Sequence, residues 1–186
     1  SGAKVSMPGM MDTVLNLGIN DAVAKGLGKQ MGDHRPALDA HRRFIQIFGD
    51  VVMGINYATF EKILQHRKQE VGINLDYQLG PEVLREVIAD YKHAVKESAG
   101  VHVPEDPWEQ LKQAIEAVFK SWNNSRAISY RDHYHIPHNL GTAVTIMAMV
   151  FGNVGEDSGT GVLFTRNPAT GNKEVYGEYL PNAQGE

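Results

Sequence analysis

The chain has 186 residues, 42% of them hydrophobic and 22% charged, which is typical of a globular protein with one sizeable domain or two small lobes. Its net charge of −4 argues against a general nucleic-acid-binding surface, and the absence of cysteine excludes disulfides and thiolate metal sites. Because no apolar run approaches the roughly 18 residues of a membrane span and no signal peptide is recognisable, we expect a cytoplasmic protein that binds neither nucleic acid nor membrane.

Helical periodicity dominates the first two thirds of the chain. Apolar residues recur there at three- and four-residue steps in four segments, 36–53, 58–70, 81–97 and 107–122. Pro36 stands near the start of the first segment. Pro81 and Glu82 suit the first turn of the third, where the helix dipole favours an acidic side chain. We therefore predict a helical block that extends to about residue 135.

The last of these segments carries long apolar side chains along one face. They are Trp108, Leu111, Ile115, Phe119 and Trp122. Full burial of each is worth about 1.5 to 3 kcal/mol. The simplest interpretation is that this face belongs to the hydrophobic core.

Strand patterns follow the helical block. Residues 141–153, GTAVTIMAMVFGN, form an apolar run of strand length, rich in Val, Thr and Ile. Residues 160–167 and 173–180 alternate in polarity on either side of a PATG turn, which is typical of a β-hairpin. At least three strands are predicted, and with the helical block they give an α+β fold.

The stretch SGTG, residues 158–161, allows two interpretations. Glycines permit positive φ and close backbone approach, so several N–H groups and two hydroxyls would be able to surround one phosphate. The stretch does not match the Walker pattern, because no Gly-Lys-Ser/Thr follows it. From spacing alone, a hairpin turn is the stronger alternative.

Other polar residues are individually ambiguous. His133, His135 and His138 in HYHIPH suggest a metal site, although a solvated loop explains them better. In the pair Arg42–Arg43, one side chain turned inward would need a carboxylate or phosphate partner, whereas two exposed helix cations are equally consistent. No catalytic triad and no carboxylate pair is recognisable.

Four stretches together carry a resemblance to a known family. They are SGAKVSMPGMMDTVLNLG (1–18), HRRFIQIFGDVVM (41–53), SWNNSRAISYR (121–131) and the whole of 141–186. These stretches resemble pyruvate phosphate dikinases, with MPGMMDT and SGTGVLFTRNPATG as the most specific strings. The resemblance covers essentially the whole chain.

The resemblance implies a multidomain transferase, homo-oligomeric as a whole protein. In this family an N-terminal domain of ATP-grasp type binds ATP, a histidine on a swivelling domain carries the phosphoryl group, and a barrel binds pyruvate. ATP, phosphate and pyruvate yield AMP, diphosphate and phosphoenolpyruvate, with Mg²⁺ required. This chain resembles the central part of the ATP-binding domain, with 1–135 as a mainly helical subdomain and 141–186 as a strand-rich phosphate-loop region.

The resemblance also assigns residues to the nucleotide site. Ser158, Gly159, Thr160 and Gly161 match the phosphate loop, and Arg43 matches an arginine that faces the phosphates. Met147 and Met149 match positions near the adenine, where soft side chains suit a flat ring, and Met11 is placed in the same cleft. Glu186 matches a glutamate near the phosphates and metal, whereas Glu178 is by default on a solvated strand edge.

Several family elements are missing from the sequence. The ATP lysine and a phosphate-binding arginine would precede Ser1, further metal and ribose ligands would follow Glu186, and no phosphohistidine signature is present. We therefore expect a piece of a longer protein that is inactive alone and binds nucleotide weakly at best. The alternatives are a related water dikinase, such as a phosphoenolpyruvate synthase, and a non-enzymatic helical binding module.

Overall fold

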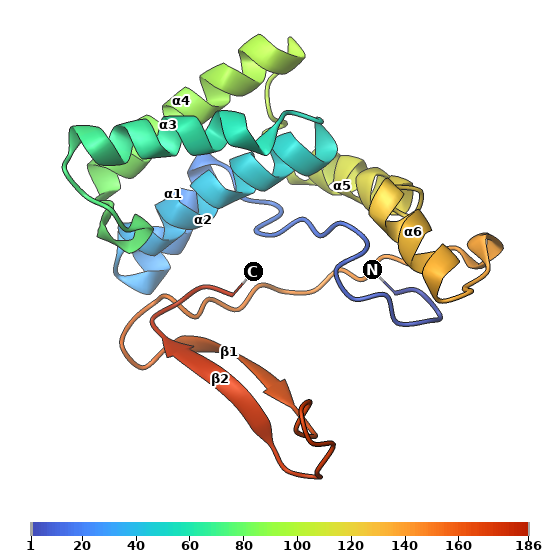
Figure 1. Cartoon of the computed structure of the whole chain (residues 1–186). Helices are drawn as coiled ribbons and strands as arrows, with labels where there is room; N and C mark the ends of the chain where they lie inside the picture. The colour runs from blue at the N-terminus through green and yellow to red at the C-terminus, as the bar shows by residue number, and fades with distance from the viewer. Residues whose placement is uncertain (1, 186) are drawn as a thin grey trace. The chain divides into compact units, whose positions relative to one another are not determined.

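The structure is a computed structural model that describes residues 2–185. Within this range the chain divides into two compact units, with the boundary between Met147 and Ala148. The first unit is helical and the second contains a β-hairpin (Figure 1). This content confirms the predicted α+β fold.

The helical unit contains all four predicted helices and two more. Its helices are α1 (Asp21–Met31), α2 (His34–Ile47), α3 (Tyr57–Glu70), α4 (Pro81–Ala99), α5 (Pro107–Ser121) and α6 (Ser125–His133). A π-helical turn, η1 (Phe48–Val52), prolongs α2, and short 3₁₀ turns form η2 (Asp76–Gln78) and η3 (His138–Leu140). Periodicity missed α1 and α6, which are the two shortest α-helices of the unit.

Most of the helix starts are set by a local side chain. Five helices begin after an Asn or Asp whose side-chain oxygen accepts a hydrogen bond from a backbone N–H of the first turn. These N-caps are Asn20, Asp33, Asn56, Asp106 and Asn124. Helix α4 begins instead with Pro81 at its first position, as predicted, and ends at Gly100 in the left-handed conformation.

The core of the helical unit lies where α2 packs against α1 and α4, and α3 packs against α4 and contacts α2 as well. Phe44, Phe60 and Tyr91 are fully buried there. The rings of Phe60 and Tyr91 meet edge to face, with centroids 5.0 Å apart. The predicted apolar faces of α2, α3 and α4 therefore do form a core.

The predicted core face of α5 is largely wrong. Trp108 is 77% exposed and Phe119 is 48% exposed, while Trp122 alone of the predicted set is buried. Helix α5 buries instead its Gln110, Ala114, Val118 and Ser121 side. Small and polar residues face inward because the backbone of the N-terminal segment passes close to this side of the helix and is hydrogen-bonded by it.

The N-terminal segment, residues 7–20, is attached to α5 and the start of α6. Asp12 N–H donates to Ser121 Oγ (3.0 Å), Gly18 N–H donates to Gln110 Oε1 (2.9 Å), and Asn124 Nδ2 donates to Met10 O (3.2 Å). A small apolar cluster seals the contact, formed by Met7, Met11, Trp122, Ala127 and Ile136. Residues far apart in the sequence thus share a second core.

The second unit is a two-stranded antiparallel hairpin, β1 (Gly159–Phe164) and β2 (Tyr176–Pro181). Gly159 pairs with Pro181 and Phe164 with Tyr176, which confirms the predicted hairpin. Most of its side chains are exposed, including Val162 (61%) and Leu180 (62%). Two strands alone offer no second layer to cover their apolar faces.

The strand predicted over residues 141–153 is wrong. This segment has no regular secondary structure, and Met147 and Val150 are 79% and 88% exposed. A strand needs a hydrogen-bonded neighbour, and within residues 2–185 the only paired strands are β1 and β2. Apolar composition alone therefore does not make this segment a strand.

No helix among the described residues is long and apolar enough to cross a membrane.

Candidate functional site

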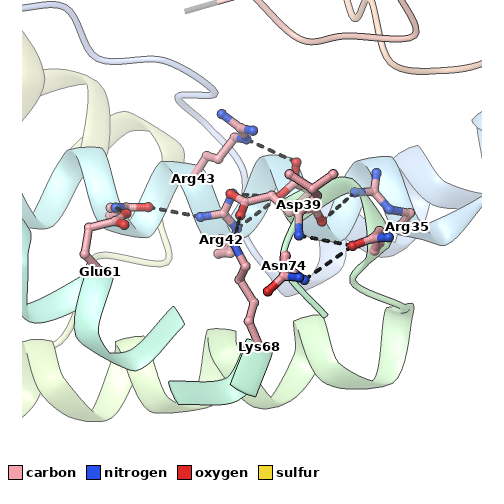
Figure 2. A network of polar contacts seen from close by, with 11 residues as sticks. Arg35, Asp39, Arg42, Arg43, Glu61, Lys68 and Asn74 are labelled. Carbon is pink, nitrogen blue, oxygen red and sulfur yellow. Dashed lines mark hydrogen bonds and ion pairs between the residues drawn. The ribbon is translucent and has the colours of Figure 1, made fainter. Parts of the chain in front are cut away.

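One face of α2 organises a buried network of charged and polar side chains around Asp39 (Figure 2). Arg42 donates from Nε (2.9 Å) and Nη2 (2.8 Å) to Asp39 Oδ1, and Arg43 donates from Nε to Asp39 Oδ2 (3.1 Å). Residues three and four positions apart lie on one helix face, so a single carboxylate can hold both guanidinium groups. Asp39 and Arg42 are 3% and 2% exposed.

The network reaches α3 and η2. Arg42 Nη1 donates to Gln46 Oε1 (3.1 Å), and Gln46 Nε2 donates in turn to Glu61 Oε1 (2.9 Å) on α3. Asp76 in η2 receives Lys68 Nζ at 2.9 Å and lies 3.5 Å from Arg42 Nη2. The buried guanidinium of Arg42 therefore has a partner on each side, as a buried charge requires.

The protonation states follow from this geometry. Burial by itself raises the pKa of Asp39, but the charges and hydrogen bonds of Arg42 and Arg43 outweigh it and hold the pKa below its ordinary value. Burial likewise lowers the pKa of Arg42, while Asp39 raises it, with a net increase. Asp39 stays ionised at neutral pH, so both arginines keep their anionic partner.

The two arginines differ in exposure, which decides between the two alternatives that the sequence left open. Arg42 points inward and is almost fully buried, whereas the Arg43 side chain is 22% exposed. Figure 2 shows the guanidinium of Arg43 directed away from the Arg42 side of the network. Arg42 thus links α2 to η2 through Asp76 and, by way of Gln46, to α3. Asp39 fixes the direction of the more accessible Arg43.

The SGTG stretch begins a strand and is not the hairpin turn. Gly159, Thr160 and Gly161 lie in β1 opposite residues 179–181, and the turn is formed by residues 165–175. A Cβ on Gly159 would overlap the ring of Tyr179, and one on Gly161 would lie 2.6 Å from Glu178 O. None of these glycines has a positive φ, so here glycine serves close approach between strands.

Ser158 is fixed by the backbone on both sides of the strand start. Its N–H donates to Gly155 O (3.1 Å), and its carbonyl oxygen accepts the N–H of Asn182 (2.8 Å). Gly152 approaches Gly159 and Ala183 so closely that a Cβ would overlap their backbone. Residues 152–161 and 182–183 therefore form one tightly packed strand end in which backbone groups lie close together.

The remaining predicted residues are distributed over both units. Met11 is buried in the cluster under the N-terminal segment, Met147 is exposed and Met149 is half-buried. Met11, Arg43 and Met147 belong to the helical unit, while Met149 and the SGTG stretch belong to the hairpin unit. Glu186, to which a metal role was assigned, lies outside the described residues.

In HYHIPH, His138 is hydrogen-bonded to neighbouring protein side chains. Arg131 is 1% exposed, lies 4.1 Å from the centroid of the Trp122 ring, and donates from Nε to His138 Nδ1 (2.9 Å). His138 Nε2 contacts Asp132 Oδ1 at 3.0 Å. Because Nδ1 accepts from Arg131, the His138 proton lies on Nε2 and points at Asp132. Residues 2–185 contain no group of three or more His, Asp or Glu side chains placed to hold a metal ion.

Sequence reasoning missed the residue at the centre of the network. Asp39 stands three and four positions before two arginines, a spacing that places a carboxylate beside both of them on a helix. That signal was available, but a lone Asp in a helix usually faces solvent. Gln46, Glu61, Lys68 and Asp76 join the network only through tertiary packing, so no local pattern indicates them.

Comparisons with known proteins give the family. Residues 2–183 match the family described as pyruvate phosphate dikinase, AMP/ATP-binding domain. The chain is 55% identical over 186 residues to a pyruvate, phosphate dikinase of Rhizobium meliloti (strain 1021), and 55% identical to the chloroplastic pyruvate, phosphate dikinase of Mesembryanthemum crystallinum. It is 53% identical over 187 residues to a pyruvate, phosphate dikinase of Clostridium symbiosum.

Each alignment covers the whole of this chain but only 21%, 20% and 21% of the respective relative, so the chain spans about a fifth of their length. The match to the family nevertheless extends over nearly every residue of the chain, and it includes both the Asp39 network and the SGTG strand. The chain belongs to the pyruvate phosphate dikinase family, within its AMP/ATP-binding domain.

Proposed function

We propose that this chain supplies part of the ATP site of a pyruvate phosphate dikinase. The observation that carries the proposal is the match to the AMP/ATP-binding domain over residues 2–183, with 53 to 55% identity along the whole chain. The parent reaction would convert ATP, phosphate and pyruvate to AMP, diphosphate and phosphoenolpyruvate. The phosphohistidine and pyruvate-binding domains would lie in other parts of a longer, homo-oligomeric protein.

Arg43 is the strongest candidate for a phosphate contact. Its side chain is partly accessible, and its Nε donates to Asp39 Oδ2, which fixes the direction of a guanidinium whose planar donors suit a phosphate. Phosphoryl transfer depends mainly on positioning and on neutralising negative charge. An arginine that a buried carboxylate holds in one direction would position the phosphate and neutralise part of its charge.

The SGTG strand end is the second part of the proposed site. Ser158, Gly159, Thr160 and Gly161 would approach the phosphates through backbone N–H groups and hydroxyls, and their glycines already allow the close packing that the hairpin shows. Met147 and Met149 would contact the adenine, and Met11 would support the cleft from its buried position.

Mg²⁺ would enter with ATP, because it prefers phosphate oxygens together with one or two carboxylates. Glu186 is the residue proposed to provide a carboxylate. We also propose a cytoplasmic setting for this chain; two of the three relatives named above are bacterial by organism and one is chloroplastic by name.

The proposal is tested by calorimetric titration of Mg-ATP into this chain and into a protein extended to the length of its relatives. We expect the extended protein to bind and this chain to bind weakly or not at all. Phosphoenolpyruvate formation by this chain alone would contradict the proposal that the phosphohistidine and pyruvate-binding domains lie in other parts of a longer protein. If neither protein binds Mg-ATP, the nucleotide site is refuted and a helical binding module becomes the better interpretation.

Arg43→Met in the extended protein tests the phosphate contact. Removing a charged hydrogen-bonding partner is worth roughly 1.5 to 3 kcal/mol, which is an affinity loss of about tenfold to a hundredfold. Lys62→Met on the exposed side of α3 removes the same charge and is the matched control. Equal affinity of the two variants would refute the role of Arg43.

A further inference from the structure

A cavity of about 620 Å³ lies between α1, α2 and α4, and it contains none of the residues proposed for the nucleotide site. Each helix contributes one face to it. On α2 the lining residues are His34, Leu38 and His41, at steps of four and three. On α4 they follow the same helical spacing, from Arg85 to Lys92.

The charges around this cavity are predominantly positive. Its lining contains three cations, Lys25, Arg85 and Lys92, against one carboxylate, Asp21, together with the imidazoles of His34 and His41. That carboxylate is already neutralised, because Lys92 Nζ lies 3.0 and 2.9 Å from its two oxygens. Lys92 also lies 3.3 Å from Glu105.

Two of the cations remain available to a ligand. Within the part of the chain that the structure describes, Lys25 makes no hydrogen bond or ion pair. Arg85 pairs only with Glu82 on its own helix, and both side chains are at least half exposed, so that pair is weak and easily exchanged. A surface with two such cations over a cavity attracts an anion.

The inner end of the cavity carries a buried imidazole. His41 is 3% exposed, and its Nδ1 lies 3.6 Å from Asp21 Oδ1, beyond hydrogen-bond distance. Burial, and then the charge of Lys92, lower the pKa of His41 to about 4, so the ring is neutral at pH 7 and offers one donor and one acceptor. His41 lines the cavity, so the donor and the acceptor of its neutral ring are groups that a ligand in the cavity would meet.

The walls between these groups are apolar. Leu38, Ile88 and two alanines, Ala24 and Ala89, line the cavity beside the charged residues. A cavity of this size, with mostly apolar walls and a few polar groups that converge, is the usual form of a small-molecule site. A free inorganic anion would leave the apolar walls uncovered.

We propose that this cavity binds a small organic anion, with a carboxylate, sulfonate or phosphate group between Lys25 and Arg85 and a compact apolar body against Leu38 and Ile88. The apolar body would reach toward His41. Such a site would let a metabolite act on the packing of α1, α2 and α4.

The test uses benzenesulfonate, whose charge is constant across the accessible pH range, and benzenesulfonamide, a neutral ring of the same size. Binding to the chain is followed at pH 7 through the imidazole resonances of His41 in ¹H–¹³C spectra. We expect the sulfonate to shift these resonances with saturation below about 10 mM, and the sulfonamide to bind at least tenfold more weakly. No shift with the sulfonate, or equal affinities of the two probes, would overturn the proposal.

Charge-removing variants distinguish binding at these two cations from general attraction of an anion to the protein. Lys25→Gln with Arg85→Gln removes the two available cations, and Lys62→Gln with Lys112→Gln removes two exposed cations elsewhere as the matched control. We expect the first pair to weaken sulfonate binding roughly tenfold or more and the control pair to change it less than about twofold. Equal effects of the two pairs would show only general charge attraction and would refute the site.

Ala89→Phe, which fills the cavity from α4 without changing charge, should abolish sulfonate binding. Unchanged circular dichroism would show that each variant is folded. Retained binding by a folded Ala89→Phe variant would overturn the placement of the ligand.

Discussion

The helical unit and the hairpin unit both contain large apolar side chains, but only the helical unit buries most of them. In the helical unit, Phe44, Phe60 and Tyr91 are completely buried. In the hairpin unit, Val162, Leu163 and Leu180 are more than 60% exposed. The helices cover one another's apolar faces, whereas a two-stranded sheet has no second layer of its own.

The difference shows where each unit obtains its stability. The helical unit is stabilised by its N-caps, its hydrophobic core and a buried ion network, all within residues 2–147. The hairpin has a defined strand register and close approach at its glycines, but its own sheet has two strands within residues 2–185 and most of its side chains are exposed. Substitutions should therefore have large effects on the first unit and local effects on the second.

The largest effect is expected for Asp39→Ala. The substitution leaves the buried guanidinium of Arg42 without its main partner, and breaking a buried pair from one side costs about 3 to 5 kcal/mol. Urea unfolding followed by circular dichroism measures the loss. Glu82→Ala, which breaks the exposed pair with Arg85, is the control, and we expect a loss of at most about 1 kcal/mol. Similar losses in the free energy of unfolding for both variants would mean that the buried network contributes no more stability than an exposed ion pair.

Acid should destabilise the helical unit through His41. Burial, followed by Lys92, lowers its pKa from 6.5 to about 4, so the unfolded state binds more protons between these two values. Stability from this group is complete above pH 6.5 and is lost as pH falls to 4, by roughly 3 kcal/mol. Denaturation across this range measures the slope. His41→Gln should flatten it, while His66→Gln at an exposed position should not.

Gly159→Ala should disturb only the hairpin. The new Cβ would overlap the ring of Tyr179 across the strand pair, and such overpacking costs typically 1 to 3 kcal/mol. We expect faster amide exchange in β1 and weaker cross-strand contacts by NMR, with the urea transition of the helices unchanged. A shift of that transition would mean that the two units unfold together.

The smallest effect is expected in α1, where two glycines differ in surroundings. Gly26 is exposed with no atom within 4 Å of an added Cβ, so Gly26→Ala should stabilise by about 0.5 to 1 kcal/mol. Gly28→Ala would overlap the ring of His34 and should destabilise instead. Thermal unfolding of both variants decides this, and shifts of the same sign would contradict the packing of α1 on α2.

The fold was predictable from the sequence where the signal is local. Periodicity located α2 to α5, and the alternation around PATG located the hairpin. It did not locate the inward face of α5, because Gln110 and Ser121 turn inward to bind a backbone almost a hundred residues away. Nor does strand-like composition at 141–153 decide pairing, since a strand depends on a neighbour that the segment itself does not specify.

The candidate site was predictable to a smaller extent. The sequence left open whether one of Arg42 and Arg43 turns inward, and the partner, Asp39, was overlooked. Asp76 meets Arg42 and Lys68 only after α3 and η2 have folded back. The hairpin turn favoured for SGTG from spacing alone was wrong, because these glycines lie in β1 and allow close approach between strands, while their approach to a phosphate stays a prediction. Side-chain networks depend on tertiary contacts, which sequence spacing does not contain.

The attachment of the N-terminal segment to α5 has a consequence for the order of folding. The hydrogen bonds from Asp12 and Gly18 close loops of 109 and 92 residues, while the helix caps span two or three. Closing a loop becomes less probable as the loop lengthens, by about 0.6 kcal/mol for each doubling. The segment that carries Met11 should therefore dock last and release first, and the exchange of the Asp12 and Gly18 amide protons would report that release before α2 and α4 open.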